Sequence, residues 1–336
     1  MADDELLVVG IDAGGTKVRA LVCDRYGVRR GTGLAAGANP VSRGIAGTVE
    51  QLEIALHAAL CTVDRSRVAA VALGMAGAAA FAQELAGVLP GVGERAGLHC
   101  PWVQLSDLEA AFAAGSAEDD GLVVLSGTGA SVAEIRDRRM IRFLDGAGWL
   151  LGDLGSGFWL GCEAARAAVA DREGRGEPTA LTALLAERLA VAPPAPGMLP
   201  GADPGIRELV AAVYRRTPVS LSEFAPLVSQ TAAQGDAIAL RLIDRAAEAL
   251  LGEVALMLRD VSASWVVLAG GVLLAEGPLR DAVSRGLTER SGLCIGYGRD
   301  GAGGAVWRGL QEVQGALPES RAGRLAIHSR LTSAQD

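Results

Sequence analysis

Apolar residues near the start of the chain form two short runs that flank a glycine turn. Residues 6–12 are expected to form a buried strand, residues 13–16 a tight turn, and residues 18–24 a returning strand that stops at Arg25-Tyr26-Gly27. Apolar runs bounded by glycine and charged residues are typical of buried strands. The pattern therefore predicts a β-hairpin with a glycine tip.

The same pattern recurs about a hundred residues later. An apolar run at 122–125 leads into the glycine-threonine turn at 126–129, and residues 130–136 return as a second strand. Residues 6–25 and 121–138 share an apolar strand, a glycine-threonine turn, a return strand and a final Asp-Arg pair. We infer a duplicated unit, in which two glycine hairpins could hold one polyphosphate from opposite sides.

Longer stretches of apolar periodicity predict helices around and after the two hairpins. The predicted helices cover about residues 45–62, 108–114, 157–171, 179–189, 206–214 and 236–260, with one more from residue 278. The predicted short strands cover residues 68–73, 103–105 and 265–268. From Leu317 onward the chain is polar and patternless, so residues 317–336 are expected to be a disordered or loosely packed tail.

Chain length indicates more than one compact body. The chain has 336 residues, half of them apolar, which is enough for a large core divided between two lobes. We expect an N-terminal lobe over residues 1–108, to which a helix near 305–316 could be added, and a C-terminal lobe over residues 109–304. Two lobes would leave a ligand cleft between them.

Charge and cysteine usage exclude several classes of partner. The formal net charge is −8 and the arginines form no basic run, so nucleic acid is not an expected partner. Five scattered cysteines without a C-x-x-C pair, and three histidines without ligand spacing, argue against structural zinc and disulfides. The acidic N-terminus and the absence of a membrane-length apolar run predict a cytoplasmic protein with no membrane partner.

The first glycine turn has the composition of a phosphate site. Gly14 and Gly15 let the backbone approach a ligand closely, so that successive N–H groups and the Thr16 hydroxyl can donate to phosphate oxygens. Asp12 faces the same turn, and a negative charge at a phosphate site makes sense only if a cation intervenes. Magnesium, held mostly through water, is the expected ion.

Lys17 is the only lysine in the chain, and it follows this turn directly. A compact ammonium differs from a planar guanidinium, so lysine at this position predicts a phosphate contact. The alternative is a solvated lysine whose solitude reflects an arginine-favouring coding bias. The segment is not a P-loop, because the chain contains no G-x-x-x-x-G-K-[ST] motif.

Six motifs occur in the same order as in N-acetylglucosamine kinases of the BadF/BadG/BcrA/BcrD ATPase family, which the chain resembles over about residues 6–310. The motifs are Asp-Ala-Gly-Gly-Thr-Lys at 12–17, Gly-Met-Ala-Gly at 74–77, Ser-Asp at 106–107, Leu-Ser-Gly-Thr-Gly at 125–129, Gly-Asp-Leu-Gly-Ser-Gly at 152–157 and Ala-Gly-Gly at 269–271. The resemblance implies an α/β protein with a duplicated actin-like (ribonuclease H-like) ATPase fold. In that fold two lobes close on ATP and a sugar.

The resemblance also implies roles for single residues. Thr16 and Thr128 would contact ATP phosphates, and the nucleoside would lie by Gly270 and Gly271. The candidate ATP site is therefore Asp12, Gly14, Gly15, Thr16, Lys17, Gly127, Thr128, Gly129, Gly270 and Gly271. Relatives in the family are commonly homodimers, so a homodimer is expected.

The sugar pocket is implied by the resemblance as well. Its candidate residues are Asn39, Asp107, Gly146, Ala147 and Asp153. Taken alone, Asn39 before a proline is an ordinary turn former. Asp153 in its glycine-rich loop would by default be a solvated turn aspartate.

The chain departs from the family pattern on the sugar side. The family usually has Gly-Gly-Trp-Gly ahead of Gly-Asp-Glu-Gly-Ser. Here Ala147 stands in place of the aromatic residue, and Leu154 in place of the acid. We therefore still predict phosphoryl transfer. The identity of the sugar, and the way its 2-substituent is recognised, are left open by these changes.

Phosphoryl transfer needs positioning, charge neutralisation and a base for the attacking hydroxyl. Asp107 follows a predicted strand and precedes a predicted helix. We assign it as the general base for a sugar hydroxyl, that on carbon 6, a role worth about 10²–10⁴-fold in rate. The alternative is that Asp107 only caps the helix, since Ser-Asp before an apolar run is an ordinary helix start.

The predicted function is an ATP- and Mg²⁺-dependent kinase that converts N-acetylglucosamine to its 6-phosphate, with glucosamine or another hexose as alternative substrates. A second alternative is the ATPase activator of an acyl-CoA reductase or dehydratase, but residues 125–129 lack the cysteine needed for its iron-sulfur cluster. A third is a sugar-sensing regulator related to ROK repressors. The chain lacks the cysteine-rich zinc motif and leading DNA-binding helices of that group.

Overall fold

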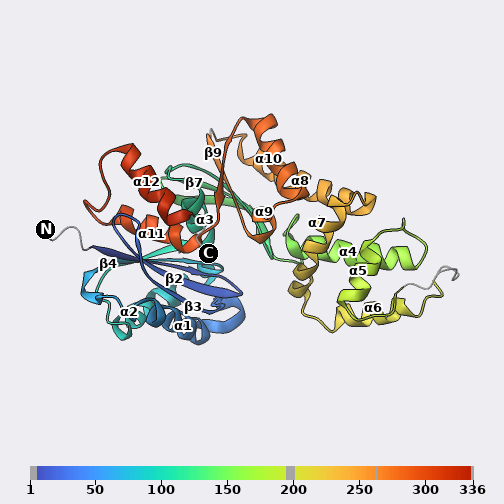
Figure 1. Cartoon of the computed structure of the whole chain (residues 1–336), viewed down its shortest axis with the longest axis horizontal. Coiled ribbons are helices and arrows are strands. Elements are labelled where there is room, and N and C mark those ends of the chain that lie inside the picture. Colours follow the sequence, from blue (N-terminus) through green and yellow to red (C-terminus); the bar gives the residue numbers. More distant parts are fainter. Residues whose placement is uncertain (1–5, 194–200, 262, 334–336) are drawn as a thin grey trace. The chain divides into compact units, whose positions relative to one another are not determined.

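The computed structural model describes residues 6–193, 201–261 and 263–333, and Figure 1 shows the whole chain. Its contacts divide the chain into two compact units. Unit 1 contains the chain up to residue 121, residues 135–141 and the chain from residue 296; unit 2 contains residues 122–134 and 142–295. Within the described residues, no helix is long and apolar enough to cross a membrane.

Unit 1 is built on a five-stranded sheet with the strand order β3-β2-β1-β4-β5. The strands are β1 (Leu7–Ala13), β2 (Lys17–Asp24), β3 (Arg29–Ala36), β4 (Val68–Met75) and β5 (Trp102–Ser106). β1 pairs antiparallel with β2 and parallel with β4, and β4 pairs parallel with β5. The predicted first hairpin is therefore confirmed, and its glycine turn lies between β1 and β2.

Helices cover both faces of this sheet (Figure 1). The helical segments are α1 (Pro40–Ala59), η2 (Arg65–Arg67), η3 (Ala78–Phe81), α2 (Ala82–Arg95), α3 (Asp107–Gly115), α11 (Gly301–Glu312) and α12 (Arg321–Thr332). On β1, Val9 packs into the cluster formed with α1 and α2, whereas Val8 packs into the cluster formed with α11 and α12. β1 is therefore a continuous apolar run because both of its faces are covered.

Unit 2 contains a second five-stranded sheet, with the order β10-β9-β6-β7-β8. Its strands are β6 (Gly121–Ser126), β7 (Ala130–Arg136), β8 (Arg139–Asp145), β9 (Trp265–Ala269) and β10 (Cys294–Gly298). β6 pairs parallel with β9, as β1 does with β4. Read from β8, this order repeats that of the first sheet. The three consecutive strands β8, β7 and β6 correspond to β3, β2 and β1, and β9 and β10 correspond to β4 and β5. The inferred duplication is therefore confirmed at the level of topology.

The helices of unit 2 follow the second hairpin. They are α4 (Gly157–Arg172), α5 (Leu181–Arg188), α6 (Gly205–Tyr214), η4 (Pro218–Phe224), α7 (Ala225–Ala233), α8 (Ala237–Met257), α9 (Gly271–Leu274) and α10 (Pro278–Ser291). α4 and α8 match the predicted helices to within a few residues. Their apolar faces are buried against neighbouring helices, which is why the periodicity was legible in the sequence.

The C-terminal segment corrects one prediction. Residues 321–332 form α12 rather than a loosely packed tail, while residues 334–336 of the expected tail lie outside the described residues. Ile327 and Leu331 are one helical turn apart and buried, and His328 packs edge-on against Trp307 of α11 with ring centroids 5.2 Å apart. Two apolar residues on one face were enough to dock a short, otherwise polar helix.

The boundary between the units also differs from the predicted boundary at residue 108. Contacts place α3 and α11 in unit 1, because these two helices pack against each other and against β1. The strands β3 and β8 were not predicted. β3 is rich in arginine and glycine and contains a single buried position, so its pairing with β2, rather than an apolar pattern, makes it a strand.

The close approach of α11 to β1 gives a test of unit 1 packing. A Cβ atom at Gly10 would collide with the backbone of Ala302 and lie 2.6 Å from Cγ2 of Val306. Gly10→Ala should therefore destabilise the protein by about 1–3 kcal/mol, measured by urea unfolding. Gly87→Ala on α2, where a Cβ meets nothing within 4 Å, is the control and should stabilise by about 0.5–1 kcal/mol. Equal stability of the two variants would contradict this packing.

Candidate functional site

Two carboxylates of unit 1 lie at one edge of its sheet. Asp12 on β1 is in register with Gly74 of β4, and Met75 of β4 with Ser106 of β5. β1, β4 and β5 run parallel, so Asp12 and Asp107 both lie at the carboxyl ends of strands. That edge is where ligands bind in open α/β sheets. The structure thus brings together two residues that are 95 positions apart in sequence.

The first glycine turn is closed by backbone contacts. The Gly14 N–H donates to the Lys17 carbonyl (3.0 Å), and the Gly14 carbonyl accepts from the Ala38 N–H (2.9 Å). A Cβ atom at Gly37 would collide with the Gly15 carbonyl, so the segment before α1 supports the turn from behind. Gly15, Thr16 and Lys17 are exposed, as a turn must be if it is to meet a ligand.

The surroundings of Asp12 disfavour the charged form of its carboxyl group. Its pKa is raised to about 6, first by burial and then by the charges of Asp107 and Asp300, while Lys17 and Arg19 act in the opposite direction. Burial also raises the pKa of Asp107, against the hydrogen bonds that its carboxylate accepts from backbone N–H groups. Acids held in this way bind protons or cations more readily than solvated acids.

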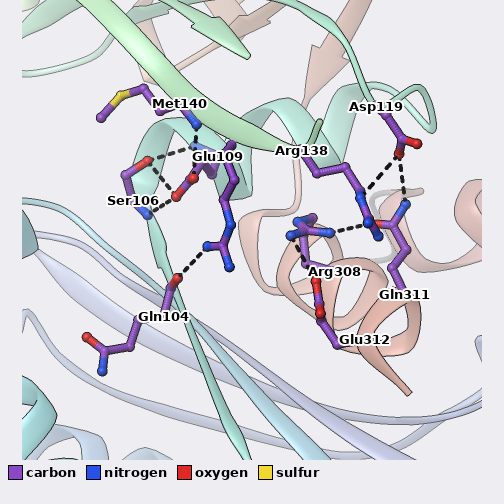
Figure 2. A network of polar contacts seen from close by, with 10 residues as sticks. Gln104, Ser106, Glu109, Asp119, Arg138, Met140, Arg308, Gln311 and Glu312 are labelled. Atoms are coloured by element: carbon purple, nitrogen blue, oxygen red, sulfur yellow. Dashed lines mark hydrogen bonds and ion pairs between the residues drawn. The ribbon is translucent and has the colours of Figure 1, made fainter. Parts of the chain in front are cut away.

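Asp107 is not the cap of α3. Ser106 is the N-cap: its Oγ accepts from the Glu109 N–H (3.1 Å), while Oε2 of Glu109 accepts from the Ser106 N–H (2.6 Å). Figure 2 shows this capping box, and Oε1 of Glu109 also accepts from the Met140 N–H (3.0 Å). Asp107 is thus the first residue of α3 and not its N-cap. Its role as the base stays a prediction.

Asp300 belongs to the same cluster and was missed by the sequence reasoning. It is 3% exposed, caps α11 through the Gly303 N–H (3.0 Å), and pairs with Arg19 (3.2 Å) and Arg29 (3.0 Å). A Cβ atom at Gly301 would lie 2.6 Å from Oδ2 of Asp12, so the first turn of α11 abuts that carboxylate. An aspartate between a strand and a glycine-rich helix start was the signal that could have found it.

Asn39 caps α1. Its Oδ1 accepts from the Val41 N–H (2.9 Å), and a Cβ atom at Gly77 would lie 3.0 Å from the same oxygen. Asn39 is thus a helix cap rather than a plain turn former, and its contact with a sugar stays a prediction. Its position beside Gly77 places it at the loop that follows β4, on the side of the sheet edge that carries Asp12.

The second glycine turn, residues 126–129 of unit 2, packs against a third glycine turn at Gly270 and Gly271. The Gly127 N–H donates to the Gly129 carbonyl (2.9 Å), and the Gly127 carbonyl accepts from the Gly157 N–H at the start of α4 (2.7 Å). Gly270 has φ +86°, and a Cβ atom there would collide with the Ser126 carbonyl. The residues predicted to bind ATP in this unit, 127–129 and 270–271, therefore lie together.

Asp153 lies against the second hairpin. It is 8% exposed, has φ +60°, and a Cβ atom at Gly129 would lie 2.9 Å from its Oδ2. Burial raises its pKa, and the hydrogen bond from the Ala130 N–H acts against that rise. Asp153 is therefore no solvated turn residue. Gly146 and Ala147, from the same loop, are exposed.

A magnesium ion is compatible with these residues only as a largely hydrated ion. Among the described residues, no three histidine, cysteine, aspartate or glutamate side chains are placed to hold a metal. Mg²⁺ usually keeps several waters and needs only one or two carboxylates plus phosphate oxygens. Asp12, whose pKa is raised by neighbouring acids, fits such a site.

Solved structures confirm the fold. A proposed N-acetylglucosamine kinase from Chromobacterium violaceum aligns with a TM-score of 0.69 at 24% identity, over 90% of this chain and 98% of that one. A similar protein from Porphyromonas gingivalis gives 0.67 at 19%, over 97% and 98%. A ROK glucokinase from Streptomyces griseus, solved with glucose and AMPPNP, gives 0.58 at 21%, over 91% and 99%. The predicted α/β, actin-like fold is therefore correct.

Sequence comparisons also find a sugar kinase and an ATPase family among similar proteins. An N-acetylmuramic acid/N-acetylglucosamine kinase from Clostridium acetobutylicum is 28% identical over 179 residues, 51% of this chain. The match spans about half of that relative, 54% of its length. The model of the BadF/BadG/BcrA/BcrD ATPase family matches residues 9–306. Since this stretch is most of the chain, the protein belongs to the BadF/BadG/BcrA/BcrD ATPase family.

Proposed function

We propose that the protein is an ATP-dependent sugar kinase that phosphorylates N-acetylglucosamine on its 6-hydroxyl. The observation that carries this proposal is the pair Asp12 and Asp107 at the carboxyl edge of a sheet, beside a glycine turn that bears the only lysine. The partial match to a kinase of N-acetylmuramic acid and N-acetylglucosamine supports the substrate class.

Asp107 is proposed as the general base. A raised pKa makes a carboxylate a better proton acceptor, and burial has this effect on Asp107. Ser106 and Glu109 form the cap of α3, and the Asp107 carboxylate also accepts hydrogen bonds from backbone N–H groups at the start of this helix. We propose that a sugar hydroxyl donates to an acceptor position that remains on this carboxylate. The proton would pass to this carboxylate as the hydroxyl oxygen attacks the γ-phosphorus of ATP, and ADP would leave.

Asp12 is proposed to hold Mg²⁺ through water, and Lys17 to contact phosphate. When bound, the metal would neutralise phosphate charge during transfer. The exposed N–H groups of the turn at 14–16 would donate to phosphate oxygens, and Thr128 and Gly270 of unit 2 are proposed ATP contacts. The two lobes, the cytoplasmic location and the homodimer expected from the sequence remain proposals.

The sugar is proposed to contact Asn39, Asp107, Gly146, Ala147 and Asp153. Ala147 and Leu154 replace residues that the family usually carries, and both are exposed, so glucosamine and other hexoses remain alternative acceptors. The activator alternative is not favoured, because the described glycine turns carry no cysteine for an iron-sulfur cluster.

The test is ADP formation with MgATP and a panel of N-acetylglucosamine, N-acetylmuramic acid, glucosamine, N-acetylmannosamine and glucose. We expect sugar-dependent turnover, with N-acetylglucosamine preferred. Asp107→Asn should keep near-normal binding of ATP and sugar but lose about 10²–10⁴-fold in kcat. ATP hydrolysis indifferent to all sugars would refute the kinase, and near-wild-type turnover of the variant would remove Asp107 as the base.

Lys17→Arg tests the phosphate contact. The side chain is exposed at the mouth of the turn, and a guanidinium there is larger and planar. We expect the KM for MgATP to rise about tenfold, the loss of one charged hydrogen bond, with little change in the KM for sugar. Arg188→Lys on the exposed face of α5 is the control. If steady-state kinetics show no change in ATP use, Lys17 is a solvated residue.

Asp12→Asn should separate stability from activity. In the folded protein Asp12 keeps its proton up to a pKa of about 6, whereas in the unfolded chain it releases the proton near 3.8. The free energy of unfolding therefore falls as the pH rises between these two values, and it stays lower above them. The variant should gain about 1–3 kcal/mol at pH 8 in EDTA and nothing near pH 4, while MgATP turnover drops. Urea unfolding at both pH values checks this, with the exposed Asp64→Asn as control. A less stable variant at pH 8 would show that Lys17 and Arg19 dominate.

A further inference from the structure

Asp145 is a carboxylate that the proposed function leaves unused. It ends β8 with φ +58°, and its side chain turns toward the loop that follows. Oδ1 accepts from the Asp153 N–H (2.7 Å) and more weakly from the Ala147 N–H (3.4 Å), while Oδ2 accepts from the Leu154 N–H (2.9 Å). One side chain thus ties together both ends of residues 146–154, which we call the 146–154 loop.

Two aspartates at the ends of the loop have a backbone conformation that is unusual for them. Asp145 and Asp153 have φ +58° and +60°, and a non-glycine residue in that region is uncommon. Gly146 and Gly148 also have positive φ, which glycine adopts without steric cost. No side chain fits at Gly152, because a Cβ atom there would collide with Oδ1 of Asp145. Conformations of this kind persist only where surrounding contacts hold them.

We propose that Asp145 is a positioning residue that holds the 146–154 loop in its ligand-binding form. The assignment of a sugar to the loop rests on the proposed function; the hold itself does not. Gly146, Ala147 and Asp153 lie in this loop, so its conformation sets the position of three proposed sugar contacts.

Amide hydrogen exchange tests the hold without any catalytic assay. Asp145→Asn is the variant of choice, because asparagine tolerates positive φ but its amide nitrogen cannot accept a hydrogen bond. Asparagine keeps one acceptor oxygen, so one of the Asp153 and Leu154 amides loses its acceptor, and the protection of that amide should fall at least about tenfold. Asp120→Asn, the same change at the acceptor of the Asp137 N–H (2.7 Å) in unit 1, should leave both amides unchanged. Unchanged protection in Asp145→Asn would overturn the proposal.

Kinetics test the consequence for the sugar. Asp145→Asn should raise the KM for sugar about tenfold with a smaller change in kcat, as expected from the loss of one charged hydrogen bond. Glu248→Gln, at an exposed position on α8, is the matched control and should leave both constants unchanged.

The two readouts separate the possible failures. If the protein turns over no sugar but one of the Asp153 and Leu154 amides still loses protection in Asp145→Asn, the proposed function fails and the positioning role stands. If sugar turnover is normal and its KM is the same in wild type and Asp145→Asn, the positioning role fails and the kinase stands.

Discussion

The parallel register of β1, β4 and β5 is the constraint on which the candidate site of unit 1 depends. It sets the end of β1 beside the end of β4, and the end of β4 beside the end of β5, so that Asp12 and Asp107 share one edge of the sheet. The register is enforced because both faces of β1 are buried, and a slip of one residue would turn each apolar side chain to the wrong face. Unit 2 repeats the arrangement with β6 and β9, which brings the turns at 127–129 and 270–271 together.

Glycine is used in both units for the same physical purpose, the close approach of backbone to backbone. Gly37 lets its segment touch the Gly15 carbonyl, and Gly270 does the same at Ser126. Each candidate phosphate turn is thus supported from behind by a neighbouring segment while its own tip stays open. A side chain at either supporting position would displace the turn. This explains why the motifs pair glycines that are distant in sequence.

Both units concentrate negative charge at a cost in stability. In unit 1 burial, and then the carboxylates of Asp107 and Asp300, raise the pKa of Asp12, and Arg19 and Arg29 pair with Asp300. In unit 2 burial, and then the charge of Asp145, raise the pKa of Glu253 on α8. Acids with a raised pKa are more frequent at functional sites than elsewhere in proteins.

The sequence by itself determined the two glycine hairpins, their duplication and the main helices, because apolar periodicity and glycine turns are local signals. It also fixed the order of the six motifs, and with them the fold. The capping box of Ser106 and Glu109 is a local signal as well, because the two residues are three positions apart. Only the tertiary structure decided that Asp153 is buried against Gly129 and that Asp300 pairs with Arg19 and Arg29. These contacts join residues far apart in the chain, as do those that dock the buried side chains of α12 against α11.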